Sequence, residues 1–463
     1  MPAATPPTEP QPVGLRTAGR RRSALVAGIA ASVLLLASCG SGAHAEEPSG
    51  SASRSPAVPL ASPQCAGTVA TALGVIAKHV YHELSGGRIA RPAVERVAGS
   101  TALIAAAEAH DPAAARAAIA PLLRNQLVRV RVIVAGRTLL DYGTANAVAP
   151  VSAPLQNAGG RTIGEVIGSE QGVLGYSDTV HTISGAQVFV RTNAHALGRP
   201  SNAHDLGGSS NIRALGGSSN TAPASIPSAG EMVWNGTRYA VYSFAGLGFP
   251  KIPLRTYVLA PVPPASACAS KAAETAADAI GGAAERIYRD EQSGAQTRAV
   301  VRDFESSRAF QEAVSSDNRP ATEAAIVAFF KSTLHVVRVR ATLGERLVAD
   351  VGGPHVLAPI RGDVRDPYGH VVGHFLLSVQ DDLGYVILAH RFAGLQVFLS
   401  QGGLPLAVGQ GGLGDTGPVP ADLPARGEVT YKGLPYHTYS FTAEAFPKGP
   451  LQVQLLIPPV RGA

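Results

Sequence analysis

The sequence has little of what enzyme and metal sites are commonly built from. Its 463 residues include three cysteines and one tryptophan, and only 16% are Asp, Glu, Lys or Arg. It contains no C-x-x-C pair, H-E-x-x-H segment, G-x-S-x-G elbow or G-x-x-x-x-G-K-[ST] loop. Those are the signatures of thiol redox, zinc protease, hydrolase and nucleotide sites. We therefore expect a protein that is not an enzyme and that uses no metal or other cofactor.

A strong charge is also missing. The formal net charge is +6, and residues 1–38 contribute +3 of it. No basic run stands beside aromatic residues, so we expect no nucleic-acid partner.

Long hydrophobic runs are absent as well. The hydrophobic run near the N-terminus is short. Arg20, Arg21 and Arg22 precede an apolar run over residues 24–37, which is shorter than the roughly 20 residues of a spanning helix and typical of a signal peptide. The run ends in "LASC", which resembles the bacterial lipobox, in which cleavage before the cysteine is followed by lipidation of its sulfur. We predict a lipoprotein signal peptide over residues 1–38 and a lipid such as palmitate on Cys39. The alternative is an uncleaved N-terminal anchor.

The residues after Cys39 complete the prediction for localisation. Residues 39–63 are rich in Ser, Gly, Ala and Pro, the composition of a flexible, disordered tether. The protein is therefore expected on the extracytoplasmic face of the cell membrane, held by its N-terminal lipid. Whether export uses the general or the twin-arginine route stays open.

Two cysteines remain after Cys39. Cys65 and Cys268 each stand just ahead of a helical stretch, and an even pair outside the cytoplasm favours a disulfide. Two buried free thiols are the alternative.

Most of the chain consists of two similar copies of one sequence. "GYSDTVHTISGAQVFV" (residues 175–190) matches "GYVILAHRFAGLQVFL" (residues 384–399), and a constant separation of 209 residues also joins Arg129 to Arg338. Further on, "GEMVWNGTRYAVYSF" matches "GEVTYKGLPYHTYSF" at a separation of 197, so the first copy carries 12 extra residues. We predict two domains of one design, residues 64–264 and 265–463.

The extra residues lie in a low-complexity segment. "NAHALGRPS", "NAHDLGGSS" and "NIRALGGSS" follow one another between residues 193 and 220. We interpret them as a mobile surface loop, because the aspartate and glycine pattern of a calcium-binding nonapeptide is absent.

Each copy changes from helical to strand periodicity. "CAGTVATALGVIAKHVYHELSGG" has apolar residues at helical spacing, and a shorter helix is predicted after Asp111 and Pro112. The segments that follow, starting with "LVRVRVIV", alternate with a period of two. The expected fold class is α+β, with a long N-terminal helix packed on an antiparallel sheet of five to six strands in each copy.

These segments resemble Cache domains, the PAS-like extracytoplasmic sensors of bacterial receptors. The resemblance is carried by the long leading helix, "VRVRVIVAGRTLLDYG", "RTIGEVIGS", "ISGAQVFVR" and "GTRYAVYSF". It implies a small-molecule pocket between the inner face of the sheet and its covering loops, with both chain ends on the membrane side. Cache receptors continue into a kinase or other output module, and none is recognisable here, so we expect a membrane receptor or kinase partner.

Six side chains at matched positions are candidates for ligand binding: Tyr176, His181 and Tyr239 in the first copy, and Tyr385, His390 and Tyr436 in the second. The histidines either bind a polar ligand group or are satisfied by backbone carbonyls at a helix end. The tyrosines either face a pocket or cover the edge of the core.

Two further patterns are left open. Arg129 and Arg131 lie on one strand face, either exposed or donating to an anion. His79, His82 and Glu83 have metal-ligand spacing, but the second copy has Arg286 and Arg289 in the corresponding region, so no metal is predicted.

The sequence thus predicts a non-enzymatic, membrane-anchored lipoprotein that binds a small molecule and acts through a partner protein. The alternative is a structural or adhesive envelope lipoprotein without a ligand. A substrate-binding lipoprotein for a transporter is disfavoured, because its two-lobed fold needs alternating strands and helices.

Overall fold

The structure is a computed structural model that describes residues 59–86, 89–123, 127–192, 223–333, 336–406 and 423–460. The predicted signal peptide, Cys39, most of the tether and the loop at 193–220 lie outside the described residues. Within the described residues, no helix is both long and apolar enough to cross a membrane.

The first half consists of five helices and ten strands among its described residues. The helices are α1 (Pro63–Gly86), α2 (Ala90–Ala98), α3 (Thr101–Glu108), α4 (Pro112–Leu123) and α5 (Val173–Ser184), and the strands are β1 (Arg129–Val134), β2 (Arg137–Gly143), β3 (Ala147–Val148), β4 (Val151–Gln156), β5 (Thr162–Ser169), β6 (Gln171–Gly172), β7 (Gln187–Thr192), β8 (Gly230–Trp234), β9 (Thr237–Gly248) and β10 (Ile252–Pro261).

The second half repeats this order after a short 3-10 turn, η2 (Ala265–Ala267). Its helices are α6 (Ala272–Ser293), α7 (Ala295–Glu305), α8 (Arg308–Ser315), α9 (Arg319–Ser332) and α10 (Asp382–Ala393), and its strands are β11 (Arg338–Leu343), β12 (Arg346–Gly352), β13 (Val356–Leu357), β14 (Ile360–Arg365), β15 (Val371–Ser378), β16 (Gln380–Asp381), β17 (Gln396–Gln401), β18 (Leu404–Pro405), β19 (Arg426–Tyr431), β20 (Leu434–Glu444) and β21 (Pro450–Ile457).

The strands of each half form two main sheets, so the expectation of one five- to six-stranded sheet per copy is wrong. A four-stranded sheet has the order β2-β1-β5-β4 in the first half and β12-β11-β15-β14 in the second. The larger sheet has the order β6-β3-β9-β10-β7, with β8 on β9, and β18-β17-β21-β20-β19 in the second half. Mixed helices and antiparallel sheets are confirmed, and the long leading helix packs on the larger sheet.

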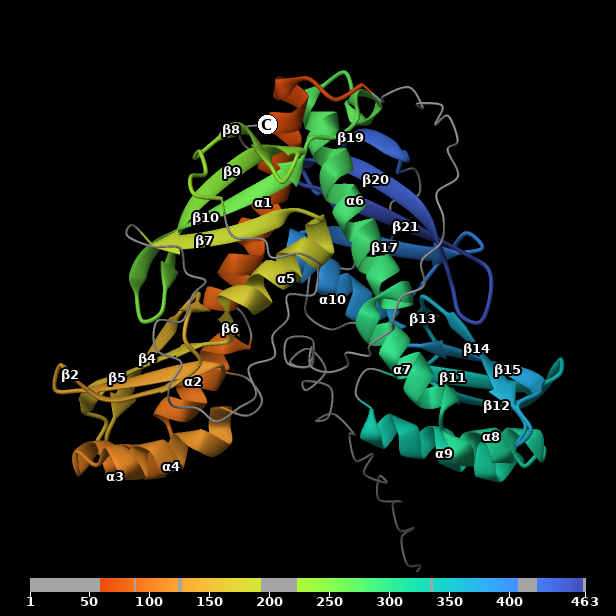
Figure 1. Ribbon diagram of the computed structural model, residues 1–463, viewed down its shortest axis with the longest axis horizontal. Coiled ribbons are helices and arrows are strands. Elements are labelled where there is room, and N and C mark those ends of the chain that lie inside the picture. The colour runs from red at the N-terminus through yellow and green to blue at the C-terminus, as the bar shows by residue number, and fades with distance from the viewer. Residues whose placement is uncertain are drawn as a thin grey trace, which may run out of the picture.

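Each four-stranded sheet has a hydrophobic core of its own. In the first half, α2, α3 and α4 cover one face, and their apolar side chains pack against alternate residues of β1 such as Val130 and Val132. In the second half, α7, α8 and α9 do the same, around the rings of Phe304, Phe310 and Phe375. Figure 1 shows these two helix-covered sheets at the far end of the molecule from the start of α1.

The short helices α5 and α10 carry the chain from the smaller to the larger sheet in each half. Gly185 and Gly394 follow them in the left-handed conformation, at φ 73° and 68°, which glycine adopts without steric cost. A left-handed glycine therefore ends each of these two connecting helices.

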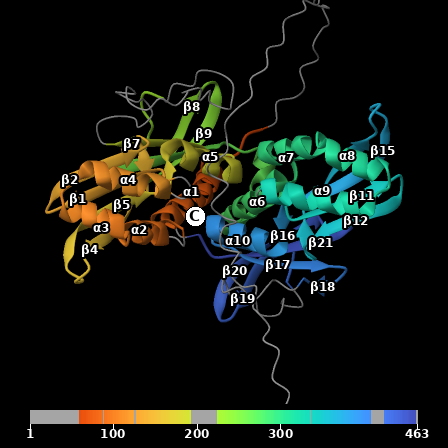
Figure 2. The same ribbon diagram turned by 90° about the horizontal axis from the view of Figure 1, so that it is seen from below.

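The two halves share one hydrophobic core. Helices α1 and α6 begin side by side and diverge towards the four-stranded sheets (Figure 1), and buried residues of both line a single cluster with α5 and α10. Packing is reciprocal, because α1 contacts α10 and α6 contacts α5. Figure 2 shows the matching pseudo-two-fold arrangement, with β8 and β9 on one side and β19 and β20 on the opposite side.

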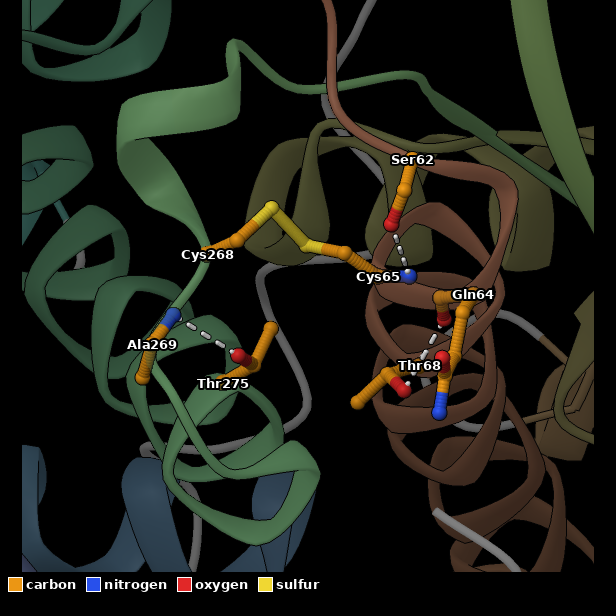
Figure 3. Close-up of a disulfide and its surroundings, with 7 residues drawn as sticks. All are labelled: Ser62, Gln64, Cys65, Thr68, Cys268, Ala269 and Thr275. Atoms are coloured by element: carbon orange, nitrogen blue, oxygen red, sulfur yellow. Dashed lines mark hydrogen bonds between the residues drawn. A yellow bond between two sulfur atoms is a disulfide. The ribbon is translucent and has the colours of Figure 1, made fainter.

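A disulfide joins the starts of the two long helices. Cys65 lies in the first turn of α1 and Cys268 just before α6, with an S–S distance of 2.01 Å and a Cα–Cα distance of 6.0 Å (Figure 3). The chain is already packed ahead of it, since Leu60 pairs with Pro264 and Ala61 is buried. Leu60 and Ala61, which fall within the predicted tether, thus pack against the first half.

An ion-pair cluster crosses the junction between the halves. Arg391 on α10 lies 3.4 Å from Glu170 and 3.9 Å from Glu83 on α1. Burial raises the pKa of Glu170, while the nearby Arg391 opposes that rise.

Candidate functional site

The two matched tyrosines predicted to bind ligand lie in the core. Tyr176 and Tyr385 are fully buried. The hydroxyl of Tyr176 donates a hydrogen bond to the carbonyl of Ala77 on α1 at 2.9 Å, and that of Tyr385 to the carbonyl of Ala284 on α6 at 3.0 Å. Burial raises the pKa of both phenols. Their polar groups are therefore already satisfied by the long helix of the same half.

The two matched histidines are satisfied by backbone. Nδ1 of His181 lies 3.1 Å from the carbonyl oxygen of Ala186, and Nδ1 of His390 lies 3.2 Å from that of Leu395. Each contact ties the last turn of a connecting helix to the residue that follows the glycine stop. Of the two roles left open by the sequence, the structure shows the helix-end role.

Tyr239 and Tyr436 belong to aromatic clusters on the outer faces of the two larger sheets. The Trp234 ring lies 6.0 Å from that of Tyr239 and 5.2 Å from that of Phe189. The second half has the same set in Tyr436, Tyr431 and Phe398. The structure places these two tyrosines in separate clusters, and it does not bring the six predicted side chains together around one cavity.

The arginines of the first strand lie on the face of the smaller sheet that is turned away from its helices. Asp141 accepts hydrogen bonds from both Arg129 and Arg131, at 2.9 Å and 2.5 Å for the closest pairs. Burial acts to raise the pKa of Asp141, but the two guanidinium groups hold it below its usual value.

In the first half this sheet face is closed by the hairpin between β9 and β10. The ring of Phe249 lies 4.7 Å from the guanidinium carbon of Arg129 and packs with Ile167. Beside it, Lys251 donates to Glu165 at 2.6 Å. An aromatic ring and an ion pair therefore fix the hairpin tip onto the sheet.

In the second half the same face carries a hollow. Its volume is about 510 Å³. The side chains that define it come from β11, β14 and β15 and from the turn before β12: Arg340, Thr342, Glu345, Arg361, Val371, His374 and Leu376.

The two halves differ in the ion pair that holds the hairpin on this face. His374 stands in the second half where Glu165 stands in the first, so the corresponding hairpin lysine, Lys448, has no carboxylate there and forms no ion pair with a described residue. Phe446 remains over Arg338, 5.0 Å from its guanidinium carbon.

Polar groups on the hollow are partly engaged with one another. Nδ1 of His374 lies 3.2 Å from Asp363, which also accepts a hydrogen bond from Arg365 at 2.9 Å. In the described residues, no group of three or more His, Cys, Asp or Glu side chains is placed to hold a metal ion. The arrangement offers charged donors to a ligand rather than a nucleophile and its base.

Sequence reasoning missed the hollow. The predicted site residues are those that the two copies have in common. The hollow depends instead on matched positions at which the copies differ, such as Ser152 in the first copy and Arg361 in the second. A comparison of the copies for changes of charge at matched strand positions would have found it.

Comparisons with known proteins add little. No family model matches the chain, and no curated protein matches it. Among solved structures, it is similar to the periplasmic domain of Vibrio cholerae LuxQ, at 10% identity and a TM-score of 0.22, over 43% of this chain and 98% of that one. A TM-score of this size does not by itself establish a shared fold.

Proposed function

We propose that this protein is an extracytoplasmic lipoprotein, anchored by a lipid on Cys39, that binds a small molecule and acts through a membrane receptor or kinase partner. It is a binding module of two PAS-like or Cache-like halves rather than an enzyme. Support for the location comes from the signal-peptide pattern and from the Cys65–Cys268 disulfide, a bond typical of oxidising compartments.

The single observation that carries the binding function is the hollow on the second small sheet. One fold occurs twice, and the matched sheet face is closed by Phe249 in the first half and hollowed in the second. A hollow with a largely apolar lining and a few charged donors is a common design for a ligand site.

The position of the hollow suits a ligand that arrives from outside. The described chain starts at Pro59, beside the disulfide, and the four-stranded sheets lie at the other end of α1 and α6 (Figure 1). An anchor at Cys39 would therefore attach at the opposite end of the described structure from the small sheet that carries the hollow.

A thermal-shift screen against amino acids, carboxylates, purines and polyamines tests the binding function. A compound present at 100 times its Kd stabilises the folded chain by about 2.7 kcal/mol. Leu376→Trp, which fills the hollow, should abolish the shift, and Val327→Trp on exposed α9, on the other side of the sheet, should retain it. A shift that survives Leu376→Trp would remove the hollow from the proposal.

Mass spectrometry of the mature N-terminus tests the anchor. We expect a chain that begins at Cys39 with a diacylglycerol on its sulfur. An intact Met1 or an unmodified Cys39 would contradict the lipoprotein.

The alternative is a structural or adhesive envelope lipoprotein. It is favoured by four of the predicted side chains, which are bonded to backbone carbonyls in or beside the core instead of facing a cavity: Tyr176, His181, Tyr385 and His390. In that case no compound of the screen would change the melting temperature.

A further inference from the structure

Three side chains form one row across the hollow. Arg340 on β11 and Arg361 on β14 are both paired with Leu376 on β15. Residues directly opposite each other on neighbouring strands point to the same face of a sheet. The row therefore places an arginine on each side of a leucine, with the two arginine Cα atoms about 10 Å apart, or two strand spacings.

The first half has no such row. Its equivalent is Arg131, Ile167 and Ser152. Arg131 is held by Asp141 at 2.5 Å, and Phe249 covers Ile167. Only the second half combines an open face with two cations.

The two arginines of the hollow are weakly neutralised by the protein. Asp350 accepts hydrogen bonds from Arg338 at 2.7 Å and 2.9 Å, and Arg340 reaches it only at 3.8 Å. Arg361 is exposed and forms no ion pair with a described residue. Its neighbour Asp363 is instead engaged with Arg365 and His374.

One negative charge opposes these cations on the rim. Glu345 lies in the turn before β12 and lines the hollow. Among the side chains that line the hollow, the two arginines outnumber this one carboxylate, while Asp350 and Asp363 lie beside them. The apolar surface of Leu376 and Val371 lies in the same hollow.

We propose that the hollow binds a small organic anion with two acidic groups joined by a short apolar chain. The acidic groups accept hydrogen bonds from Arg340 and Arg361, and the chain lies over Leu376. A guanidinium group presents paired donors that match a planar carboxylate. This inference rests on the proposed function and names the ligand class for the same site.

Calorimetric titration of the full mature chain at low salt provides the test. Glutarate and succinate are the expected ligands. Butyrate, inorganic phosphate and putrescine are the comparison probes for one acidic group, an anion without a carbon chain, and a cation. We expect glutarate or succinate to bind at least tenfold more tightly than butyrate or phosphate, putrescine not to bind, and binding to weaken as salt is added.

Matched variants locate the site. Arg361→Ser, which installs the residue of the first half, should weaken glutarate binding at least tenfold. Glu345→Gln should strengthen it, because it removes a negative charge from the lining of the hollow. Arg308→Ser, at an exposed position on α8, changes the net charge by the same amount as Arg361→Ser and should leave binding unchanged. Equal binding by Arg361→Ser and the wild type would overturn the proposal.

The failure of this inference can be told apart from the failure of the proposed function. If putrescine or a purine binds in a way that Leu376→Trp abolishes, and glutarate does not bind, the binding function stands and the diacid inference is wrong. If neither these probes nor any compound of the thermal-shift screen binds, both are wrong.

Discussion

Gly74 on α1 lies against the face of the Tyr242 ring on β9. A Cβ atom added to Gly74 would lie 2.0 Å from Cδ1 of that ring. The second half repeats the contact with Gly281 on α6 and Tyr439, at 2.1 Å. Absence of a side chain at these two positions therefore sets how closely each long helix approaches its larger sheet.

Alanine at either position should destabilise the protein. Because the ring and the helix are both held by the shared core, Gly74→Ala or Gly281→Ala should reduce the free energy of unfolding by about 1–3 kcal/mol, the usual cost of overpacking a core. Urea unfolding measures it.

The control for this prediction lies one residue away. A Cβ atom at Gly282 meets nothing within 4 Å, so Gly282→Ala should stabilise α6 by about 0.5–1 kcal/mol through helix propensity alone. Loss of stability in Gly282→Ala as well would show that the helix, and not the ring contact, responds.

Reduction of the disulfide should lower stability strongly. Cys65 and Cys268 are separated by 203 residues, and on the chain-entropy model closing a loop of that size stabilises by up to about 5 kcal/mol. Dithiothreitol should lower the melting temperature of the wild type and leave that of the Cys65→Ser/Cys268→Ser double variant unchanged. Free-thiol titration of the untreated chain gives an independent check, since a reactive Cys65 would contradict the bond.

Glu291 should make stability depend on pH. It stands on α6 where α1 has Leu84, a buried residue, since Tyr81 corresponds to Tyr288 in the same two helices. Burial, with a smaller contribution from Asp290, raises the pKa of Glu291 from 4.5 to about 7. The unfolded chain therefore releases this proton at lower pH than the folded chain, and stability falls as pH rises from about 4.5 to 7.

Glu291→Leu should remove that loss. The variant should gain more over the wild type at pH 8 than at pH 4.5, by up to about 3 kcal/mol for a shift of this size, as measured by urea unfolding at both pH values. Glu323→Leu, at a half-exposed position on α9, serves as the control. An equal gain at the two pH values would contradict the burial of this carboxylate.

Tyr176→Phe should cost stability and spare ligand binding. The change removes one buried hydrogen bond to Ala77, whose net contribution is about 1 kcal/mol. The response to glutarate should stay as in the wild type, because Tyr176 lies in the core. A loss of glutarate binding without a loss of stability would contradict this prediction and would indicate that Tyr176 belongs to the ligand site.

The helix starts and the repeat could be predicted from the sequence because they depend on local chemistry. The Asp111 side chain accepts from the amides of Ala113 and Ala114, and Asn318 caps α9 in the same way. The separation into two sheets could not be predicted, because strand alternation does not say which strands pair. Strand β4 is hard to predict because Pro154 interrupts its alternating pattern, and a proline is tolerated there because β4 is an edge strand.

The candidate site was harder to predict for a related reason. Matched tyrosines and histidines attract attention in a repeat, but Tyr176 and His181 are matched because both halves need the same joint between helix, core and strand. The core that the two halves share could not be predicted either. The apolar face of α1 predicts that the helix is buried, but it does not indicate which elements pack against it. Arg361 became notable only when the register placed it opposite Leu376.

The reciprocal packing of α1 with α10 and of α6 with α5 is the geometry of a two-fold homodimer carried on one polypeptide. In a homodimer every substitution appears in both subunits, so a sheet face that is covered in one subunit is covered in the other as well. Fusion removes that constraint. The first half has Ser152 and Glu165 under the hairpin between β9 and β10. The second half has Arg361 and His374 at the same positions, and it can therefore carry a site that the first half lacks.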